Sequence, residues 1–351
     1  MAPHLFGMRP EDLVAATRAD PDALNLDEAR RVLSAAVALG RPDLGGVRPI
    51  SAKKRAALDR LTRRAPLAVL ERFEDPVDQS VRYLFQGEDG AIFEAVRIRL
   101  DAADRFTVCL SSQAGCAMAC TFCATGRLGL RRDLSPWEIV AQWWTVRAEA
   151  PGRVSGAVFM GQGEPLHNYD AVIQAAGVLG CPTGGRIRAE SITISTVGLV
   201  GPIRRYAAEG HPYRLIVSLS SAVPERRVKL LPVAGRQPLS AVAEALAALA
   251  ERVGRVTVAW VLMGGVNTGD DEIEALAALN RIAPIRLNLI DVNDRREQGY
   301  RRATEPERAR FLDGLRGAGV PFVRRYSVGY GQNSACGMLA GRAEFTQLAE
   351  P

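Results

Sequence analysis

From residue 105 onward, the sequence alternates short β-rich runs with longer helical stretches. Runs such as FTVCLSS, SITIST and IRLNLID have the length and β-branched content of strands, and the segments between them, such as LSAVAEALAALAER, repeat apolar residues at three- and four-residue intervals. This alternation is typical of βα units whose parallel strands form a full or partial barrel. Because such barrels carry their chemistry on loops after the strand C-terminal ends, motifs at those positions are the first candidates for function.

Two other segments precede the alternating region. Residues 1–70 are helical in pattern, since EDLVAATRA, LDEARRVLSAAVALG and SAKKRAALDRLTRR all repeat apolar residues with helical spacing. Residues 71–104 contain VRYLFQ and IFEAVRIRL on either side of GEDG, which predicts a β-hairpin. We therefore expect an α/β protein with a small helical module over 1–70, a hairpin extension over 71–104 and a partial barrel over 105–351.

The composition narrows the cellular setting. The chain carries a formal net charge of +6, which is compatible with a polyanionic partner, although a coding bias toward Ala, Arg and Gly gives the same excess. Nowhere do about 18 apolar residues occur together, and the start MAPHLFGMRP has no apolar run behind a charged flank, so we expect a cytoplasmic protein without membrane contact. In such a reducing compartment the six cysteines favour metal or thiol chemistry.

The strongest chemical motif is SSQAGCAMACTFCATG, on a loop directly after a predicted strand. Its Cys116, Cys120 and Cys123 are spaced C-x3-C-x2-C. Three thiolates can bind three irons of a [4Fe–4S] cluster and leave the fourth iron open for an exogenous ligand. A zinc site usually takes four ligands in paired C-x2-C spacing, and a group of buried thiols is the other alternative. The spacing favours the cluster.

This spacing, with Phe122 between the last two cysteines, resembles the radical S-adenosylmethionine (SAM) superfamily. Within that superfamily, the chain from about Glu71 to Gly341 resembles the RlmN/Cfr family of adenine-methylating enzymes. The resemblance rests on TVCLSSQAGCAMACTFCATG, GQGEPLHNYD, SITISTVGLV, VSLSSAVPERRVKLLPV, RLNLIDVN and SACGML, in that order. It implies a partial (β/α)6-type radical SAM barrel, a [4Fe–4S] cluster, SAM used twice per turnover, and an electron donor such as flavodoxin or ferredoxin.

Two further cysteines match the thiols that define this family's reaction. The position matching Cys336 is first methylated by one SAM, and the adenosyl radical from a second SAM then removes a hydrogen from that methyl group. The resulting methylene radical adds to an sp2 carbon of adenine. The cysteine matching Cys109 forms a disulfide bond with the carrier as the product departs. For the sixth cysteine, Cys181, we expect only the role of a small buried residue.

The resemblance also assigns a proton acceptor and the SAM contacts. Glu94 matches the proposed proton acceptor; apolar neighbours would raise the pKa of its carboxyl enough for general base work, although an alternating strand also places Glu in solvent. Gly163 and Glu164 match the segment that receives the SAM amino group. The other positions matching SAM contacts are Ser195, Ser218, Leu219, Ser220 and Asn293.

The chain departs from the family pattern at positions that concern the substrate. Gln162 stands where methionine is usual, and Ser220 stands where histidine is usual. SVGYGQNSACG replaces a short Arg-Gly-acidic segment ahead of Cys336, and DRREQGYRRATEPER after Asn293 lacks the usual proline-rich run. The chain after Cys336 is also short, without the basic tail of many relatives. We expect the reaction class to be retained and the acceptor to be the open question.

The leading hypothesis is methylation of adenine C2 in large-subunit ribosomal RNA, with transfer RNA as a second acceptor. Methylation at C8 uses the same machinery and is not distinguished by spacing. The alternatives are a small heteroaromatic or peptide acceptor, and a non-catalytic RNA-binding or iron–sulfur sensor protein. Basic residues of the helical module either contact RNA phosphates or form an ordinary solvated face: Arg18, Arg30, Arg31, Lys53, Lys54, Arg55, Arg60, Arg63 and Arg64.

Overall fold

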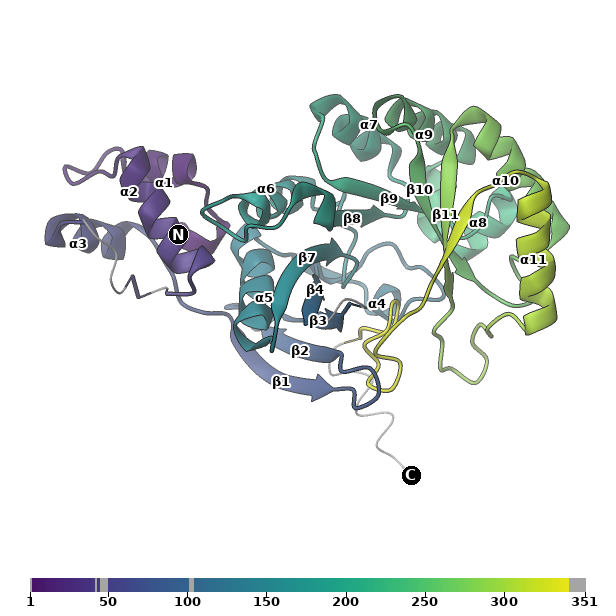
Figure 1. Cartoon of the computed structure of the whole chain (residues 1–351), viewed down its shortest axis with the longest axis horizontal. Coiled ribbons are helices and arrows are strands. Elements are labelled where there is room, and N and C mark those ends of the chain that lie inside the picture. Colours follow the sequence, from purple (N-terminus) through teal and green to yellow (C-terminus); the bar gives the residue numbers. More distant parts are fainter. Residues whose placement is uncertain (1, 42, 45–49, 101–103, 341–351) are drawn as a thin grey trace.

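The protein is built around a curved ten-stranded sheet (Figure 1). The structure, a computed structural model, describes residues 2–41, 43–44, 50–100 and 104–340. The strand order is β1-β2-β3-β4-β7-β8-β9-β10-β11-β12. All pairs from β4 onward are parallel, as expected for βα units. These strands are β4 (Arg105–Cys109), β7 (Arg153–Phe159), β8 (Ile192–Thr196), β9 (Arg214–Ser218), β10 (Val256–Leu262), β11 (Ile285–Asp291) and β12 (Phe322–Arg325).

Helices cover the outer face of the parallel strands (Figure 1). They bury apolar stripes against the strands, as the helical spacing predicted. The longer helices are α5 (Pro136–Glu149), α6 (Tyr169–Gly180), α7 (Val200–Glu209), α9 (Leu239–Val253), α10 (Asp270–Ile282) and α11 (Glu305–Gly317). Shorter ones are α4 (Ala124–Arg127), α8 (Pro224–Leu230), η3 (Ala189–Ser191) and η4 (Pro232–Arg236). No described helix has the length and apolar content needed to cross a bilayer.

The predicted hairpin is present, but it belongs to a three-stranded extension. Strands β2 (Val81–Gln86) and β3 (Ile92–Arg99) pair antiparallel, and β3 joins the extension to β4. Strand β1 (Ala68–Glu74) adds an outer edge to β2. The helical pattern expected up to residue 70 therefore ends earlier than predicted. The edge strand was missed because its side chains are mostly half-exposed and charged, so its alternation is weak.

The N-terminal helices form a lobe beside α5 and α6 (Figure 1). The elements are η1 (Leu5–Gly7), α1 (Pro10–Thr17), α2 (Leu26–Leu33), the π-helical turn η2 (Ser34–Ala38) and α3 (Ala52–Leu61). The lobe is attached through η1: the His4 ring stacks on Trp137 of α5 at 4.2 Å, and Gln174 of α6 donates to the Gly7 carbonyl at 2.7 Å. A side chain at Gly7 would overlap the Trp137 backbone, so this contact depends on glycine.

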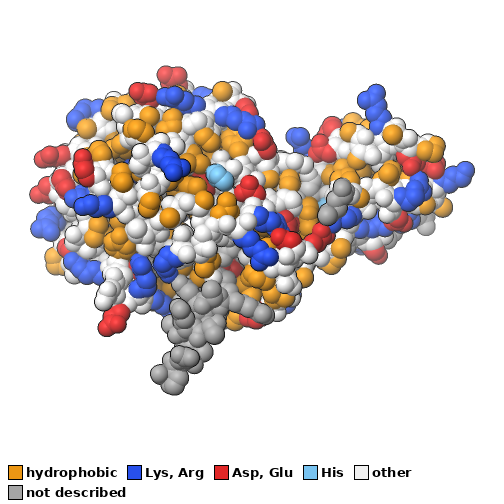
Figure 2. Space-filling model, turned by 180° about the vertical axis from the view of Figure 1, so that it is seen from behind, with side chains coloured by type: hydrophobic (Ala, Val, Ile, Leu, Met, Phe, Trp, Pro, Cys, Tyr) orange, Lys and Arg blue, Asp and Glu red, His pale blue; other side chains and the backbone are white. Residues whose placement is uncertain are grey.

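Charges of both signs are mixed over this lobe in the space-filling view (Figure 2). Five of the nine basic residues named above form ion pairs, including Lys54 with Glu28 at 2.6 Å and Arg60 with Asp20 at 2.8 Å. About half of the basic residues that could contact RNA are thus already paired with acids, four within the lobe and Arg63 with Glu88 between β2 and β3.

Candidate active site

The cysteine loop is held by a short ribbon that the sequence patterns did not reveal. Strands β5 (Gln113–Gly115) and β6 (Leu130–Asp133) pair antiparallel on either side of the loop, and the Cys116 amide donates to the Gly129 carbonyl at 2.9 Å. Gly115 has φ +79°, and a Cβ there would lie 2.0 Å from the Gly129 oxygen. The ribbon therefore closes the loop only with glycine at that position.

The three thiols of the loop lie close enough to influence one another. Burial raises the pKa of Cys116 to about 12 and that of Cys120 well above its usual range. In both cases a negative charge on Cys123 would raise it further. The donor set is therefore three sulfurs around one loop, which is the set that a [4Fe–4S] cluster with one open iron requires.

The number of donors bears on which metal group they fit. A zinc site usually takes four protein ligands, whereas a cluster with one open iron takes three thiolates, so three cysteines on one loop fit the cluster. Among the described residues, no group of three His, Cys, Asp or Glu side chains is placed to hold a single metal ion.

Glu164 lies in the same site. It is 2 % exposed, and its carboxylate accepts the Val197 amide at 2.8 Å and the Leu166 amide at 3.0 Å. Burial raises the pKa of this carboxyl to about 7, although those two amides oppose the shift. Its charge in turn raises the pKa values of Cys116 and Cys120. A buried carboxylate without a cationic partner beside the thiol loop is suited to accept an ammonium group.

Gly163, directly before this carboxylate, has a conformation that requires glycine. Its φ is +104°, and a Cβ would lie 2.7 Å from both the Gln113 Cβ and the Ser112 Oγ. The Glu164 amide donates to the Gln113 side chain at 2.8 Å. The turn thus brings the backbone against β5 and fixes Glu164 next to the cysteine loop.

The structure brings Cys336 to the cysteine loop. The amide of Ala124, next to Cys123, donates to the carbonyl of Gly337, next to Cys336, at 2.7 Å. Cys336 is exposed as a residue, yet the protein around its loop desolvates the thiol and raises its pKa to about 11, with a further increase from Cys123. The position of this thiol beside the cysteine loop is compatible with the carrier role that the family resemblance implies.

Cys109, the last residue of β4, lies near Cys336. Burial raises the pKa of Cys109 to about 12, and a negative charge on Cys336 adds to this shift. All six cysteines, Cys181 included, are free thiols. The expected disulfide bond is therefore not present in the resting protein.

Asn293 is tied to the carrier loop. Its side-chain amide donates to the Cys336 carbonyl at 3.3 Å and to Ser327 at 3.0 Å, and its oxygen accepts Arg302 at 2.7 Å. The residue expected to contact SAM therefore also positions Cys336.

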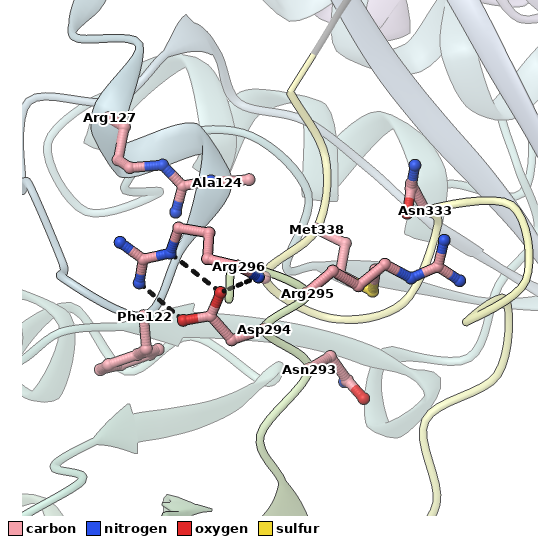
Figure 3. A pocket seen from close by; sticks show the side chains of 10 residues that line it. Phe122, Ala124, Arg127, Asn293, Asp294, Arg295, Arg296, Asn333 and Met338 are labelled. Atoms are coloured by element: carbon pink, nitrogen blue, oxygen red, sulfur yellow. Dashed lines mark hydrogen bonds and ion pairs between the residues drawn. The ribbon is translucent and has the colours of Figure 1, made fainter. Parts of the chain in front are cut away.

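A pocket of about 180 Å³ lies beside this loop (Figure 3). Phe122 and Met338 line it, and Arg127, Arg295 and Arg296 stand around it. Asp294 pairs with Arg296 at 2.6 Å within the same lining. The volume is below the about 300 Å³ at which small-molecule sites begin, so the pocket suits one ring rather than a whole ligand.

The remaining expected SAM contacts differ in accessibility. Ser195 and Ser218 are half-buried at the ends of β8 and β9. Leu219 and Ser220 are fully buried. Ser220 has φ +54° and its hydroxyl has no hydrogen-bond partner among the described atoms. An unpaired buried hydroxyl leaves room for a polar group from a ligand.

Glu94 is buried but its surroundings are not only apolar. Its carboxylate accepts Arg82 at 2.9 Å and the Gln162 side chain at 2.8 Å, and both Glu94 and Arg82 are almost fully buried. The expectation of an apolar environment for this carboxylate is therefore wrong, because Arg82 stands on β2 two residues before Leu84, the register partner of Glu94, and reaches its carboxylate. Gln162, which departs from the family pattern, is the second partner.

Arg227 of α8 is a site residue that the sequence patterns did not single out. It is 1 % exposed and donates to the carbonyl of Val197, whose amide binds Glu164. Burial lowers the pKa of Arg227 to about 10, and the charge of Cys120 opposes this shift. Nothing in the sequence PERR distinguishes a buried arginine from an exposed one, and only the fold shows that Arg227 is buried near Cys120.

Comparison with known families and proteins agrees with this geometry. The pattern of the Radical SAM superfamily matches residues 110–279. A probable RNA methyltransferase from Anaeromyxobacter sp. (strain Fw109-5) is 47% identical over 323 residues, which cover 91% of this chain and 94% of the relative. A probable dual-specificity RNA methyltransferase RlmN from Heliobacterium modesticaldum is 41% identical over 80% of this chain and 74% of its own length.

The similarity extends to a solved structure. The crystal structure of a radical SAM methyltransferase from Sphaerobacter thermophilus superposes with a TM-score of 0.87 at 34% identity, covering 96% of this chain and 99% of that one. The N-terminal lobe, the strand extension and the barrel are thus shared as one arrangement.

Proposed function

This chain belongs to the RlmN-type radical SAM RNA methyltransferases, and from that premise we propose that it carries a methyl-derived carbon on Cys336 to C2 of an adenine in large-subunit ribosomal RNA. Transfer RNA is the proposed second acceptor, which the dual-specificity name of the Heliobacterium relative supports. The single observation that carries the proposal is the convergence of Cys109, Cys336 and the cluster cysteines at one end of the barrel.

The family membership makes the chain an enzyme and implies a [4Fe–4S] cluster and SAM. We assign the cluster to Cys116, Cys120 and Cys123 and the SAM amino group to Glu164. Gly163 and four later strand-end residues complete the proposed SAM site: Ser195, Ser218, Leu219 and Ser220. When bound, the two groups supply one-electron cleavage of SAM to a 5′-deoxyadenosyl radical, and the protein orients it. Two SAM per turnover are proposed, one as methyl donor and one as radical source.

The thiols of this chain perform the carbon transfer in the proposal. The Cys336 sulfur attacks the methyl group of one SAM, so that a sulfur–carbon bond forms as S-adenosylhomocysteine leaves. After hydrogen removal from this methyl group, the carbon bonds to the adenine ring, and the adduct loses one proton and one electron to restore the aromatic ring, with the bound cluster as the electron acceptor. The Cys109 thiolate then attacks the Cys336 sulfur, which forms a disulfide and breaks the bond from Cys336 to the product carbon. The electron pair of that bond stays on the carbon, which takes up a proton to become the methyl group. Cellular thiols reduce the disulfide.

Glu94 is proposed to accept the proton that the substituted adenine carbon loses. A carboxylate held by Arg82 is charged and able to accept a proton, but its full burial requires the substrate or a water to reach it. Gln162 fixes the second oxygen. Arg82 and Gln162 therefore each hold one oxygen of this carboxylate. A fixed orientation of this kind suits a base that takes a proton from one particular atom.

RNA is favoured as acceptor over a small heteroaromatic or peptide. Both curated relatives described above are named RNA methyltransferases. Next to Cys336, Arg127, Arg295 and Arg296 surround a pocket of base size (Figure 3). A flipped base would enter there while the arginines contact the flanking phosphates.

We also propose a flavodoxin or ferredoxin as electron donor and the cytoplasm as the place of action.

The test is nucleoside mass spectrometry of ribosomal and transfer RNA from cells with the gene, without it, and with Cys336→Ala. We expect 2-methyladenosine to disappear in the last two strains. A change in 8-methyladenosine instead would move the reaction to C8. If neither nucleoside changes, RNA adenine is not the acceptor and the proposal fails.

A further inference from the structure

A second cavity, of about 750 Å³, lies inside the barrel toward the N-terminal ends of the parallel strands. Its described lining includes none of the cluster cysteines and none of the residues proposed to bind SAM. The volume falls within the about 300–1,000 Å³ typical of small-molecule sites. The cavity therefore lies below the site at the C-terminal strand ends and borders it at Met160, directly after β7.

Alternation along the strands explains which residues face this cavity. Successive residues of a strand point to opposite faces of the sheet. On β11, Ile285, Leu287 and Leu289 are fully buried in the hydrophobic core. Arg286 and Asn288, between them, line the cavity. One face of the strand thus stabilises the fold while the other is left to a ligand.

The interior positions just inside the mouth carry small or polar side chains. Barrels of this type usually fill their interior with bulky branched residues. Here the lining at these positions includes Thr107, Gly156, Thr193, Thr257 and Asn288. The interior is therefore open instead of packed.

Arginines surround the mouth. Arg105 and Arg214 are the first residues of β4 and β9, Arg255 directly precedes β10, and Arg286 is the second residue of β11. All four are exposed and line the cavity. Within the described part of the chain, none of them forms an ion pair with an acidic side chain; Arg105 donates to the Ser155 hydroxyl at 3.2 Å.

Acidic groups do little to offset this charge. Glu190 is the acidic residue in the described lining, and it already pairs with Arg188 at 3.1 Å. Three of the guanidinium groups stand at the starts of the adjacent strands β9, β10 and β11, and Arg105 stands at the start of β4, beyond β7 and β8, so four like charges line one opening. This arrangement costs stability unless an anion occupies it, and guanidinium geometry matches phosphate oxygens.

Asn288 provides an independent sign of a ligand deeper inside. It is 8 % exposed, and its side-chain oxygen is buried with no hydrogen-bond partner among the described atoms. Leaving such an acceptor unpaired costs free energy. Ile216 and Ile290 line the cavity beside it. The interior thus offers apolar walls and one acceptor that lacks a donor.

We propose that this cavity binds a nucleotide, with its phosphates on Arg105, Arg214, Arg255 and Arg286 and its base directed inward so that an exocyclic N–H meets Asn288. A free nucleotide and the 5′-phosphorylated end of an RNA strand present the same chemistry. An acidic protein would contact the arginines but could not reach the Asn288 oxygen. Cations at the opening and a hydrogen-bond acceptor inside therefore favour a small ligand that has an anionic end and a hydrogen-bond donor at its other end.

The test is equilibrium dialysis of radiolabelled ATP against the full-length holoenzyme at about 50 mM salt, where phosphate contacts are least screened. Saturating SAM is present so that ATP cannot enter the SAM site. We expect one ATP per chain. The double variant Arg255→Gln/Arg286→Gln should weaken ATP binding at least about tenfold. The matched control Arg310→Gln removes an exposed arginine of α11 outside the cavity and should change binding less than about twofold.

The variant Asn288→Leu tests the inner contact. It should weaken ATP binding while leaving the affinity for inorganic triphosphate unchanged, because triphosphate reaches only the arginines. Circular dichroism checks that this variant folds. Stronger competition by a 5′-phosphorylated RNA trinucleotide than by unlabelled ATP would assign the site to an RNA end, and weaker competition to a free nucleotide.

Three results would overturn the proposal. The first is that ATP fails to bind at saturating SAM, and the second is that Arg255→Gln/Arg286→Gln leaves ATP binding unchanged. The third is that Arg310→Gln weakens ATP binding as much as the double variant does, because that result would indicate nonspecific charge attraction. Binding of an acidic flavodoxin that depends on the same two arginines, without any binding of ATP, would assign the surface to a protein partner instead.

Discussion

At the C-terminal end of the barrel, Glu164 and the Cys336 thiol are desolvated and pair with no cation among the described residues, whereas many ionisable groups of the N-terminal lobe pair with opposite charges. Burial raises the pKa values of Glu164 and Cys336 in the first region. In the second, Lys54 and Arg60 each contact an acid within 2.8 Å. The sequence had indicated a possible function for each region, radical chemistry at the barrel end and RNA contact in the lobe.

The difference shows where the fold leaves interactions to be completed by a ligand. A buried carboxylate without a cation is costly until a cofactor supplies one. A surface ion pair is already satisfied and contributes little. We therefore expect substitutions at the barrel end to change chemistry and substitutions in the lobe to change little.

The largest effect is expected for Cys120→Ala. Removing one thiolate leaves two of the cluster's protein ligands, so iron content, the visible absorption of the cluster and 5′-deoxyadenosine formation should all fall to background. The matched control is Cys181→Ala, which removes a half-buried thiol whose one side-chain hydrogen bond among the described residues is to Thr183. A Cys120→Ala protein that still cleaves SAM would remove this loop from the proposed site.

Cys336→Ala should abolish methyl transfer without abolishing SAM cleavage. The carrier sulfur is lost, but the cluster ligands and Glu164 remain. Quantification of 5′-deoxyadenosine and methylated nucleoside in one anaerobic assay separates the two activities. Methylated product from this variant would show that the carbon does not travel through Cys336.

Cys109→Ala should stop the reaction one step later. Without a second thiol the bond between Cys336 and the product cannot be broken by disulfide formation, so a covalent protein–RNA adduct should accumulate. Denaturing gel electrophoresis with labelled RNA detects it, and Cys109→Ala/Cys336→Ala is the control that should form none. Free product released at the normal rate by the single variant would exclude the resolving role.

Sequence patterns predicted the parts of this site that are local. The seven parallel strands, β4 and β7 to β12, were recognisable because each is a β-rich run between helical stretches. The β5–β6 ribbon was not, because its strands have three and four residues and depend on the close approach at Gly115. Arg227 was missed for a related reason, since the burial of one arginine among several depends on tertiary packing.

The approach of Cys336 to Cys123 also has no local signal. It depends on a backbone hydrogen bond between Ala124 and Gly337, which are far apart in the chain. Only the family resemblance suggested that these cysteines meet. Conversely, the basic composition of the lobe suggested RNA contact, and the pairing that neutralises it is visible only in the fold.

A smaller effect is expected for Glu164→Gln. Gln keeps an oxygen for one backbone amide but removes the charge that would hold the SAM ammonium. Loss of a charged hydrogen bond of about 1.5–3 kcal/mol should weaken SAM binding about ten- to a hundredfold. Anaerobic equilibrium dialysis with labelled SAM measures this, with cluster absorption as the control for an intact site. Unchanged affinity would mean that the amino group lies elsewhere.

The smallest effect is expected for Arg30→Ala/Arg60→Ala in the lobe. These exposed side chains pair with Asp27 and Asp20, so losing both pairs should lower the free energy of unfolding by about 1 kcal/mol or less. RNA methylation should change less than about twofold, because the neutralised cations offer little attraction to phosphate. Chemical denaturation and a methylation assay at low salt measure the two quantities. A tenfold loss of methylation at unchanged stability would show that the lobe binds RNA despite its ion pairs, and the contrast between the two regions would not hold.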